Sequence, residues 1–361
     1  MNLKKIMMKN LSPITIEFMK MFGISYPIIQ AGMDGAATPP LVAAVSNAGG
    51  LGTLPLGFRS PGTALIQLNE VGKLTKAPFL TNFVLNFSTQ SFSTAIESGV
   101  KSVLFSWGMP DAYLLQQVRD NKLIMGIQVS DERSARRALE LKPDFLVCQG
   151  IEAGGHVQGN MPLSQALQEV LRVAQATPVV ASGGITTGKD IHRYLQADAA
   201  AVVMGTRFVA TQESAAHELY KQEILKAKSS ADTVLTVCLN KLWPNATHRL
   251  LRSNQTFQRW ESEGRPTGPI YIPGGALVGN RPGEHDIIAL DADGNTTWER
   301  YVDVVPVKSM LHCNVNSLGT FAGEGVGEIH DIPTVESLMH RLVVEYNLCC
   351  EAPLQTSHQM N

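Results

Sequence analysis

The stretch TPVVASGGITTGKDIHRYLQADAAAVVMG, residues 177–205, contains two short apolar runs that each end in glycine. The first run ends in Ser182-Gly183-Gly184, and the second ends in Gly205. Both are continuous runs rich in small and β-branched residues, which is typical of parallel strands with both faces covered. The segment between them has the length of a helix, so the stretch predicts a strand–helix–strand unit.

The same alternation fills residues 1–228 and predicts a barrel. Helix candidates such as 39–49, 131–142, 162–176 and 213–227 lie between the strand candidates. Eight strand–helix units indicate an α/β fold of the (β/α)₈ TIM-barrel type, and an open doubly wound sheet is the alternative. The eight apolar runs begin at Tyr26, Gly49, Ala77, Val100, Lys122, Pro143, Thr177 and Asp198.

The alternation stops after Lys228. We expect residues 229–330 to form an α+β extension over the carboxyl ends of the barrel strands. Within it, 243–269 favours a helix followed by irregular structure, and 286–305 predicts a hairpin that turns at Asp293-Gly294. A last helix lies in residues 331–361, and we expect it to pack back on the barrel.

Composition argues against several classes of protein. The net charge of −2 provides no basic surface for nucleic acid or for an anionic membrane. No apolar run is long enough to span a membrane or to serve as a signal peptide. The five cysteines lack CxxC spacing, so we expect a soluble, cytoplasmic protein with reduced thiols. No group of His, Cys and carboxylate residues has metal-ligand spacing. The sequence leaves open whether the chain forms a homo-oligomer.

Two glycine-rich turns, Ser182-Gly183-Gly184 and Gly205-Thr206, follow neighbouring predicted strands. In barrels the active site lies at the carboxyl ends of the strands, where such turns can surround phosphate oxygens with backbone N–H groups. The turns carry no lysine, so we expect a single phosphate monoester. The alternative is that the glycines only allow tight corners. A match of residues 183–189 to a nucleotide P-loop fails at Asp190, where Ser or Thr is required.

The sixth strand ends in Gly154-Gly155-His156. Near neutral pH an imidazole can accept a proton or donate a hydrogen bond to an oxyanion, so His156 is the candidate catalytic residue. The alternative is a core histidine that the backbone satisfies. We expect His248 to be structural, and the alternative is that it reaches the site. We expect Cys148 to belong to the core. Other strand ends offer Ala31-Gly32-Met33, Thr53, Asn82 and Gln128.

Four long motifs follow one another along residues 27–222: PIIQAGMDGAATPPLVAAVSNAGGLGTL (27–54), VCQGIEAGGHVQG (147–159), PVVASGGITTGKDI (178–191) and VVMGTRFVATQESAAHELYKQ (202–222). In this order they resemble the nitronate monooxygenases, formerly called 2-nitropropane dioxygenases. The segment WPNATHRLLR, 243–252, is also similar to that family. Flavin-dependent enoyl-acyl carrier protein reductases share the barrel, the phosphate turns and a similar Gly-Gly-His.

The resemblance implies FMN as cofactor. Its phosphate would lie on the turn Ser182-Gly183-Gly184 and on Gly205-Thr206, and Gly154 would pass beneath the ring. By the same matching, Ala31, Gly32, Met33, Asn82 and Gln128 would face the isoalloxazine. Amide side chains can satisfy the pyrimidine edge of a flavin, although Asn82 and Gln128 could instead cap loops.

Two positions depart from the family pattern. Gly32 stands where proline is more frequent, and Glu324 stands where glutamine is common. A carboxylate close to the phosphate of FMN would be unfavourable, so Glu324 leaves the C-terminal flavin contact open.

The resemblance also implies the reaction. An alkyl nitronate, held by His156, gives one electron to FMN, O₂ then reacts, and the products are a carbonyl compound and nitrite; a neutral nitroalkane is a further candidate substrate. Two other functions stay open. One is an NAD(P)H-dependent flavin reductase of enoyl thioesters or quinones. The other is a flavin-binding protein whose extension binds a partner.

Overall fold

The computed structural model describes residue 7 and residues 9–266, 270–271, 277–278, 281 and 283–351. Eight parallel strands form one sheet in the order β1-β9-β8-β6-β5-β4-β3-β2. A parallel bridge between Ile29 and Leu51 brings the two edges together, so the sheet is a nearly closed barrel. The TIM-barrel prediction is confirmed, and each predicted run contains one strand. The strands are β1 (Ile28–Gln30), β2 (Gly52–Pro55), β3 (Phe79–Val84), β4 (Ser102–Ser106), β5 (Ile124–Val129), β6 (Phe145–Gln149), β8 (Val179–Ser182) and β9 (Ala201–Met204).

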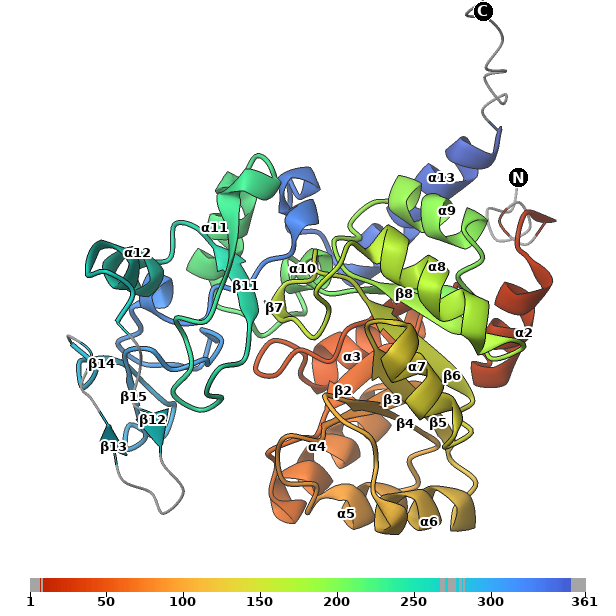
Figure 1. Cartoon of the computed structure of the whole chain (residues 1–361), viewed down its shortest axis with the longest axis horizontal. Coiled ribbons are helices and arrows are strands. Elements are labelled where there is room, and N and C mark those ends of the chain that lie inside the picture. Colours follow the sequence, from red (N-terminus) through yellow and green to blue (C-terminus); the bar gives the residue numbers. More distant parts are fainter. Residues whose placement is uncertain are drawn as a thin grey trace, which may run out of the picture.

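Helices follow the barrel strands and cover the outside of the sheet (Figure 1). Several begin where a side-chain oxygen accepts an otherwise free backbone N–H, such as Asp111 from Leu114 at 2.8 Å and Asp131 from Ser134 at 2.6 Å. The covering helices are α3 (Pro39–Asn47), α4 (Pro61–Leu74), α5 (Phe92–Glu97), α6 (Ala112–Asp120), α7 (Glu132–Leu139), α8 (Leu163–Ala174) and α9 (Gly188–Gln196). The short helix α10 (Thr206–Val209) follows β9, and α11 (Glu218–Lys226) lies beside the extension.

Helix α2 (Pro13–Phe22) covers the amino-terminal ends of the strands. Phe18 and Phe22 contact the ring of Phe145, at the start of β6, with centroid distances of 5.7 and 5.5 Å. A Cβ on Gly126 of β5 would lie 2.2 Å from the Phe145 ring, so only glycine leaves room for this aromatic cluster. One end of the barrel is therefore filled by side chains, and the other end is available for a site.

The extension lies to one side of the barrel and is coloured teal to blue in Figure 1. Its strand β11 (His248–Leu251) pairs with β10 (Thr233–Thr236) and with the short strand β7 (Gly155–His156). The prediction of a helix that begins at residue 243 is therefore wrong, because residues 248–251 form a strand. All four residues of β11 are buried, and pairing on both edges overrides the local helical pattern. Helix α12 (Gln255–Ser262) follows it.

The predicted hairpin forms from β14 (Ile287–Leu290) and β15 (Thr297–Glu299). It turns through Gly294, whose φ is +70°, while the Asp293 carboxylate accepts the N–H of Asn295 and Thr296. A second short pair consists of β12 (Ile270–Tyr271) and β13 (Leu277–Val278).

Helix α13 (Val335–Glu351) packs against α9 and α3 of the barrel. Its buried side chains include Leu338, Leu342 and Tyr346, which belong to the core of the barrel. The division of the chain at residues 228 and 330 stays a prediction. Residues 352–361 lie outside the described residues. In the described part of the chain no helix has the length and apolar character needed to cross a membrane.

Candidate active site

A cavity of about 420 Å³ lies between the carboxyl ends of the barrel strands and the extension. Its volume is typical of sites for small molecules and cofactors. From the extension, Leu242, Trp243, Asp303 and Phe321 line the cavity. All the residues predicted from the strand ends also line it, namely Ala31, Gly32, Met33, Asn82, Gln128, Gly154, His156, Ser182, Gly183, Gly184, Gly205 and Thr206.

The turn after β8 has backbone angles that favour glycine. φ is +125° at Gly183 and +68° at Gly184, where residues with side chains are strained. A Cβ on Gly184 would also lie 3.0 Å from Cβ of Glu152. Gly205 precedes α10, and the Thr206 hydroxyl accepts the N–H of Gly323 at 3.0 Å. Backbone from two neighbouring strand ends and from the extension therefore meets at this part of the cavity.

Asp190 has a structural role that explains the failed P-loop match. Its carboxylate accepts the N–H of Thr186 at 3.1 Å and of Thr187 at 2.9 Å, which caps α9. The Glu345 carboxylate accepts the N–H of Gly188 at 2.7 Å. Two carboxylates therefore occupy the N-terminus of α9, so only α10 offers a free N-terminus beside the glycine turns.

Three polar side chains at strand ends, those of Asn82, Gln128 and Thr53, keep hydrogen-bonding capacity that the described residues do not use. Asn82 donates from Nδ2 to the Leu104 carbonyl at 3.1 Å and to Ser106 Oγ at 3.2 Å, so its Oδ1 is left to accept. Gln128 donates from Nε2 to Gln158 Oε1 at 3.1 Å. The buried Thr53 hydroxyl has no hydrogen-bond partner among the described residues. Buried polar groups are normally satisfied, so these atoms fit a polar ligand in the cavity.

Both departures from the family pattern have a local explanation. A Cβ on Gly32 would lie 3.0 Å from Cβ and 3.1 Å from Oδ1 of Asn82, so any side chain there would press on this amide. Glu324 forms an ion pair with the buried Arg249 at 2.8 Å, and Arg249 also donates to the Ile151 carbonyl at 2.9 Å. The negative charge of Glu324 is therefore compensated by a neighbouring cation.

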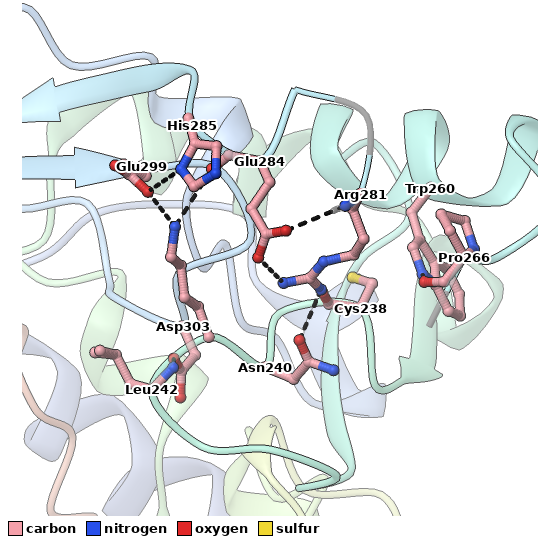
Figure 2. A network of polar contacts seen from close by, with 11 residues as sticks. Cys238, Asn240, Leu242, Trp260, Pro266, Arg281, Glu284, His285, Glu299 and Asp303 are labelled. Atoms are coloured by element: carbon pink, nitrogen blue, oxygen red, sulfur yellow. Dashed lines mark hydrogen bonds and ion pairs between the residues drawn. The ribbon is translucent and has the colours of Figure 1, made fainter. Parts of the chain in front are cut away.

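His156 lies on β7 and lines the cavity. Its ring stacks on Trp243 with a centroid distance of 4.5 Å and an interplanar angle of 27°. Its Nε2 lies 3.5 Å from Oδ2 of Asp303, whose side chain is only 5% exposed. Asp303 accepts the Leu242 N–H through Oδ1 at 3.0 Å, which holds the carboxylate in place (Figure 2). The imidazole therefore lies between the Trp243 ring and the Asp303 carboxylate, and its buried Nε2 has no hydrogen-bond partner among the described residues.

Asp303 and Trp243 line the cavity beside His156 but were not predicted from the sequence as site residues. Both lie in the extension, and their proximity to His156 depends on how the extension folds onto the barrel. The one available signal for Asp303 was a single acidic residue in the apolar run Tyr301–Val305.

His248 and Cys148 lack the properties of reacting groups. The His248 imidazole is fully buried on β11, with Nδ1 3.0 Å from the Ala246 carbonyl and Nε2 accepting the Leu239 N–H at 3.2 Å. Burial lowers the pKa of His248 to about 4, so its ring is neutral. Burial raises the pKa of the Cys148 thiol to about 12, which disfavours a thiolate. Both residues serve the core, although the helical position expected for His248 is wrong.

Comparisons with solved structures find the same fold. FabK from Thermotoga maritima superposes with a TM-score of 0.72 and 26% identity, over 93% of this chain and 97% of that chain. The nitroalkane oxidase from Streptomyces ansochromogenes gives a TM-score of 0.69 and 20% identity, over 93% and 99% of the two chains. The second likeness concerns the fold alone.

Sequence comparisons identify the family. The chain is 31% identical to a probable nitronate monooxygenase of Staphylococcus saprophyticus over 268 residues, 60% of this chain and 74% of the relative. A probable nitronate monooxygenase of Staphylococcus aureus strain JH9 is 30% identical over 288 residues, 66% and 80% of the two chains. The nitronate monooxygenase family profile matches residues 16–95 and 86–345. The chain therefore belongs to the nitronate monooxygenase family and is an oxidoreductase.

Proposed function

We propose that the protein binds FMN and oxidises nitronates with O₂ to carbonyl compounds and nitrite. The observation that carries this proposal is the meeting of all the predicted site residues in one cavity, with His156 held beside Asp303. Family membership supports the same chemistry.

The residues around the cavity fit FMN. The positive φ of Gly183 and Gly184 and the start of α10 after Gly205 suit a single phosphate, and no lysine is among the described residues that line the cavity. The unpartnered Thr53 hydroxyl and Asn82 Oδ1 offer hydrogen bonds for the ring. Bound FMN would supply the electron-accepting chemistry. The protein would hold and orient both groups and limit their access to water.

His156 would act on the substrate through Nδ1. The Asp303 carboxylate, 3.5 Å from Nε2, would favour the proton on that nitrogen, so that Nδ1 keeps its lone pair and can accept a proton from the carbon of a neutral nitroalkane. When the substrate arrives as a nitronate, no carbon proton has to be removed, and a protonated His156 would hold its negative oxygens. Asp303 would stabilise this imidazolium.

The test compares nitrite release from nitronates with NADH oxidation by FMN-loaded protein. We expect nitrite from nitronates in the absence of nicotinamide, loss of the nitroalkane reaction by about 10²-fold or more in His156→Asn, and no effect of His217→Asn, whose imidazole caps α11 at the surface. An FMN-loaded protein that releases no nitrite from any nitronate would refute the proposal.

The second candidate is an NAD(P)H-dependent flavin reductase. The 26% identity and TM-score of 0.72 to FabK favour it, and the enoyl reductase domain of MlnA from Bacillus amyloliquefaciens shares the fold with a TM-score of 0.58. NADH oxidation that depends on an enoyl thioester or quinone would support this candidate over the first.

A further inference from the structure

Four aromatic side chains form a continuous array beside His156, which we call the aromatic wall: Phe58, Phe87, Trp107 and Trp243. The Phe58 and Phe87 ring centroids are 3.9 Å apart, Phe87 and Trp243 are 4.8 Å apart, and Trp243 and Trp107 are 4.5 Å apart. Phe58, Trp107 and Trp243 line the cavity, and Phe87 joins Phe58 to Trp243. The wall therefore leads from the imidazole to Phe58, which is 43% exposed.

Two members of the wall hold strained backbone conformations. φ is +69° at Phe58 and +58° at Trp107, a region in which bulky side chains are uncommon. Glycine or asparagine would fit either position with less strain. Of the ten described non-glycine residues with positive φ, these two line the cavity, so their rings are available for a ligand contact there.

A polar network contacts Cys238 and Asn240, which precede Trp243 in the chain (Figure 2). The fully buried Arg281 donates to the Cys238 carbonyl at 3.2 Å and to Asn240 Oδ1 at 2.6 Å, and it pairs with Glu284. Lys241 pairs with Glu299 in the same region. Trp243 is thus held in place before any ligand arrives, which lowers the entropic cost of binding.

The charges around the cavity indicate which kind of substrate the aromatic wall can bind. Among the residues that line it, the charged ones are Asp34, Arg59 and Asp303. Arg59 is paired with Asp34, and Asp303 faces His156. Among the described lining residues, none offers an unpaired cation to a remote carboxylate, and an apolar aromatic face lies open instead.

We propose that the preferred substrate is an aryl nitronate, with its nitronate group at His156 and its aryl ring against the aromatic wall. This inference rests on the proposed nitronate oxidation. It predicts that short alkyl nitronates and nitronates with a remote carboxylate are poorer substrates.

The test measures kcat/KM of FMN-loaded protein for three substrates. These are the nitronate of phenylnitromethane, the nitronate of nitroethane and propionate 3-nitronate. We expect the aryl nitronate to exceed both others by at least about 10-fold. Phe58→Ala should lower the ratio of the aryl to the ethyl kcat/KM by about 10-fold, because only the aryl substrate reaches the Phe58 end of the aromatic wall. Phe58→Leu repeats the measurement should the alanine variant fail to fold. Tyr113→Ala, an exposed aromatic on α6, is the matched control and should change neither value.

Binding of nitrobenzene, measured by calorimetry, gives a second readout that needs no turnover. We expect binding to the wild type and to Tyr113→Ala, and weaker binding to Phe58→Ala. Nitrobenzene forms no nitronate and serves only as a ligand. Binding of nitrobenzene to a protein that releases no nitrite from any nitronate would refute the proposed function while supporting the aromatic site. Equal kcat/KM for aryl and ethyl nitronates, an unchanged ratio in Phe58→Ala, or loss of FMN from that variant would overturn the inference.

Discussion

At the scale of single residues, we expect Asp303 to favour the tautomer of His156 that carries its proton on Nε2, because Oδ2 lies 3.5 Å from that nitrogen. In Asp303→Asn, the amide oxygen can still accept the Leu242 N–H, while the amide N–H₂ would donate to Nε2. The remaining ring proton then moves to Nδ1, which can no longer accept a carbon proton. We expect turnover of a neutral nitroalkane to fall by about 10² to 10⁴, with a much smaller loss for the preformed nitronate.

Steady-state kcat values for both substrates check this prediction, with Asp120→Asn on the surface of α6 as control. Equal losses on nitroalkane and nitronate would show that Asp303 only holds the loop. Asp303→Glu should restore part of the nitroalkane rate, since it keeps the negative charge.

His248 makes stability depend on pH. Its folded pKa of about 4 lies below the ordinary value, so the unfolded chain binds a proton more readily than the folded one between these two values. This contribution is present above about pH 6.5 and is lost as the pH falls toward 4. We expect the wild type to lose about 2 kcal/mol more than His248→Gln between pH 7 and pH 4.5.

Urea denaturation of both proteins at the two pH values measures this difference. His217→Gln, at the start of α11, is the control and should lose as much unfolding free energy between the two pH values as the wild type does. Parallel losses in the wild type and in His248→Gln would contradict the assignment of the effect to His248.

At the scale of elements, the turn after β8 is predicted to hold the phosphate of FMN. Gly184→Val should abolish FMN retention, because valine is strained at a φ of +68° and its Cβ would lie 3.0 Å from Cβ of Glu152. FMN content per chain after gel filtration provides the measurement, with folding checked by circular dichroism. Gly72→Ala in α4, where a Cβ meets no neighbour, should keep its flavin. A folded Gly184→Val protein with full flavin content would place the phosphate elsewhere.

The N-terminus of α9 should matter for stability and not for the cofactor. Asp190→Ala removes the acceptor of the Thr186 and Thr187 N–H groups, so we expect a loss of about 1 kcal/mol in unfolding free energy. FMN content should stay unchanged. A loss of FMN without a loss of stability would mean that the phosphate lies at α9 after all.

At the scale of the whole molecule, much of the barrel and its strand-end residues could be predicted because their signals are local. Apolar runs such as 177–184 and the glycines that end them need no knowledge of distant segments. The extension was harder, since β11 forms only by pairing with β7 and β10 and contradicts its own helical pattern. Asp303 and Trp243 reach His156 through that same packing. Hence the barrel side of the cavity was predictable and the extension side was not.

The proposed nitronate oxidation is tested most directly by the absorbance of the FMN-loaded protein in the absence of O₂. We expect an aryl nitronate to bleach the flavin absorbance without any nicotinamide, and air to restore it with release of nitrite. NADH should leave the absorbance unchanged under the same conditions. Bleaching by NADH, with no change on addition of any nitronate, would contradict the account and favour the flavin reductase.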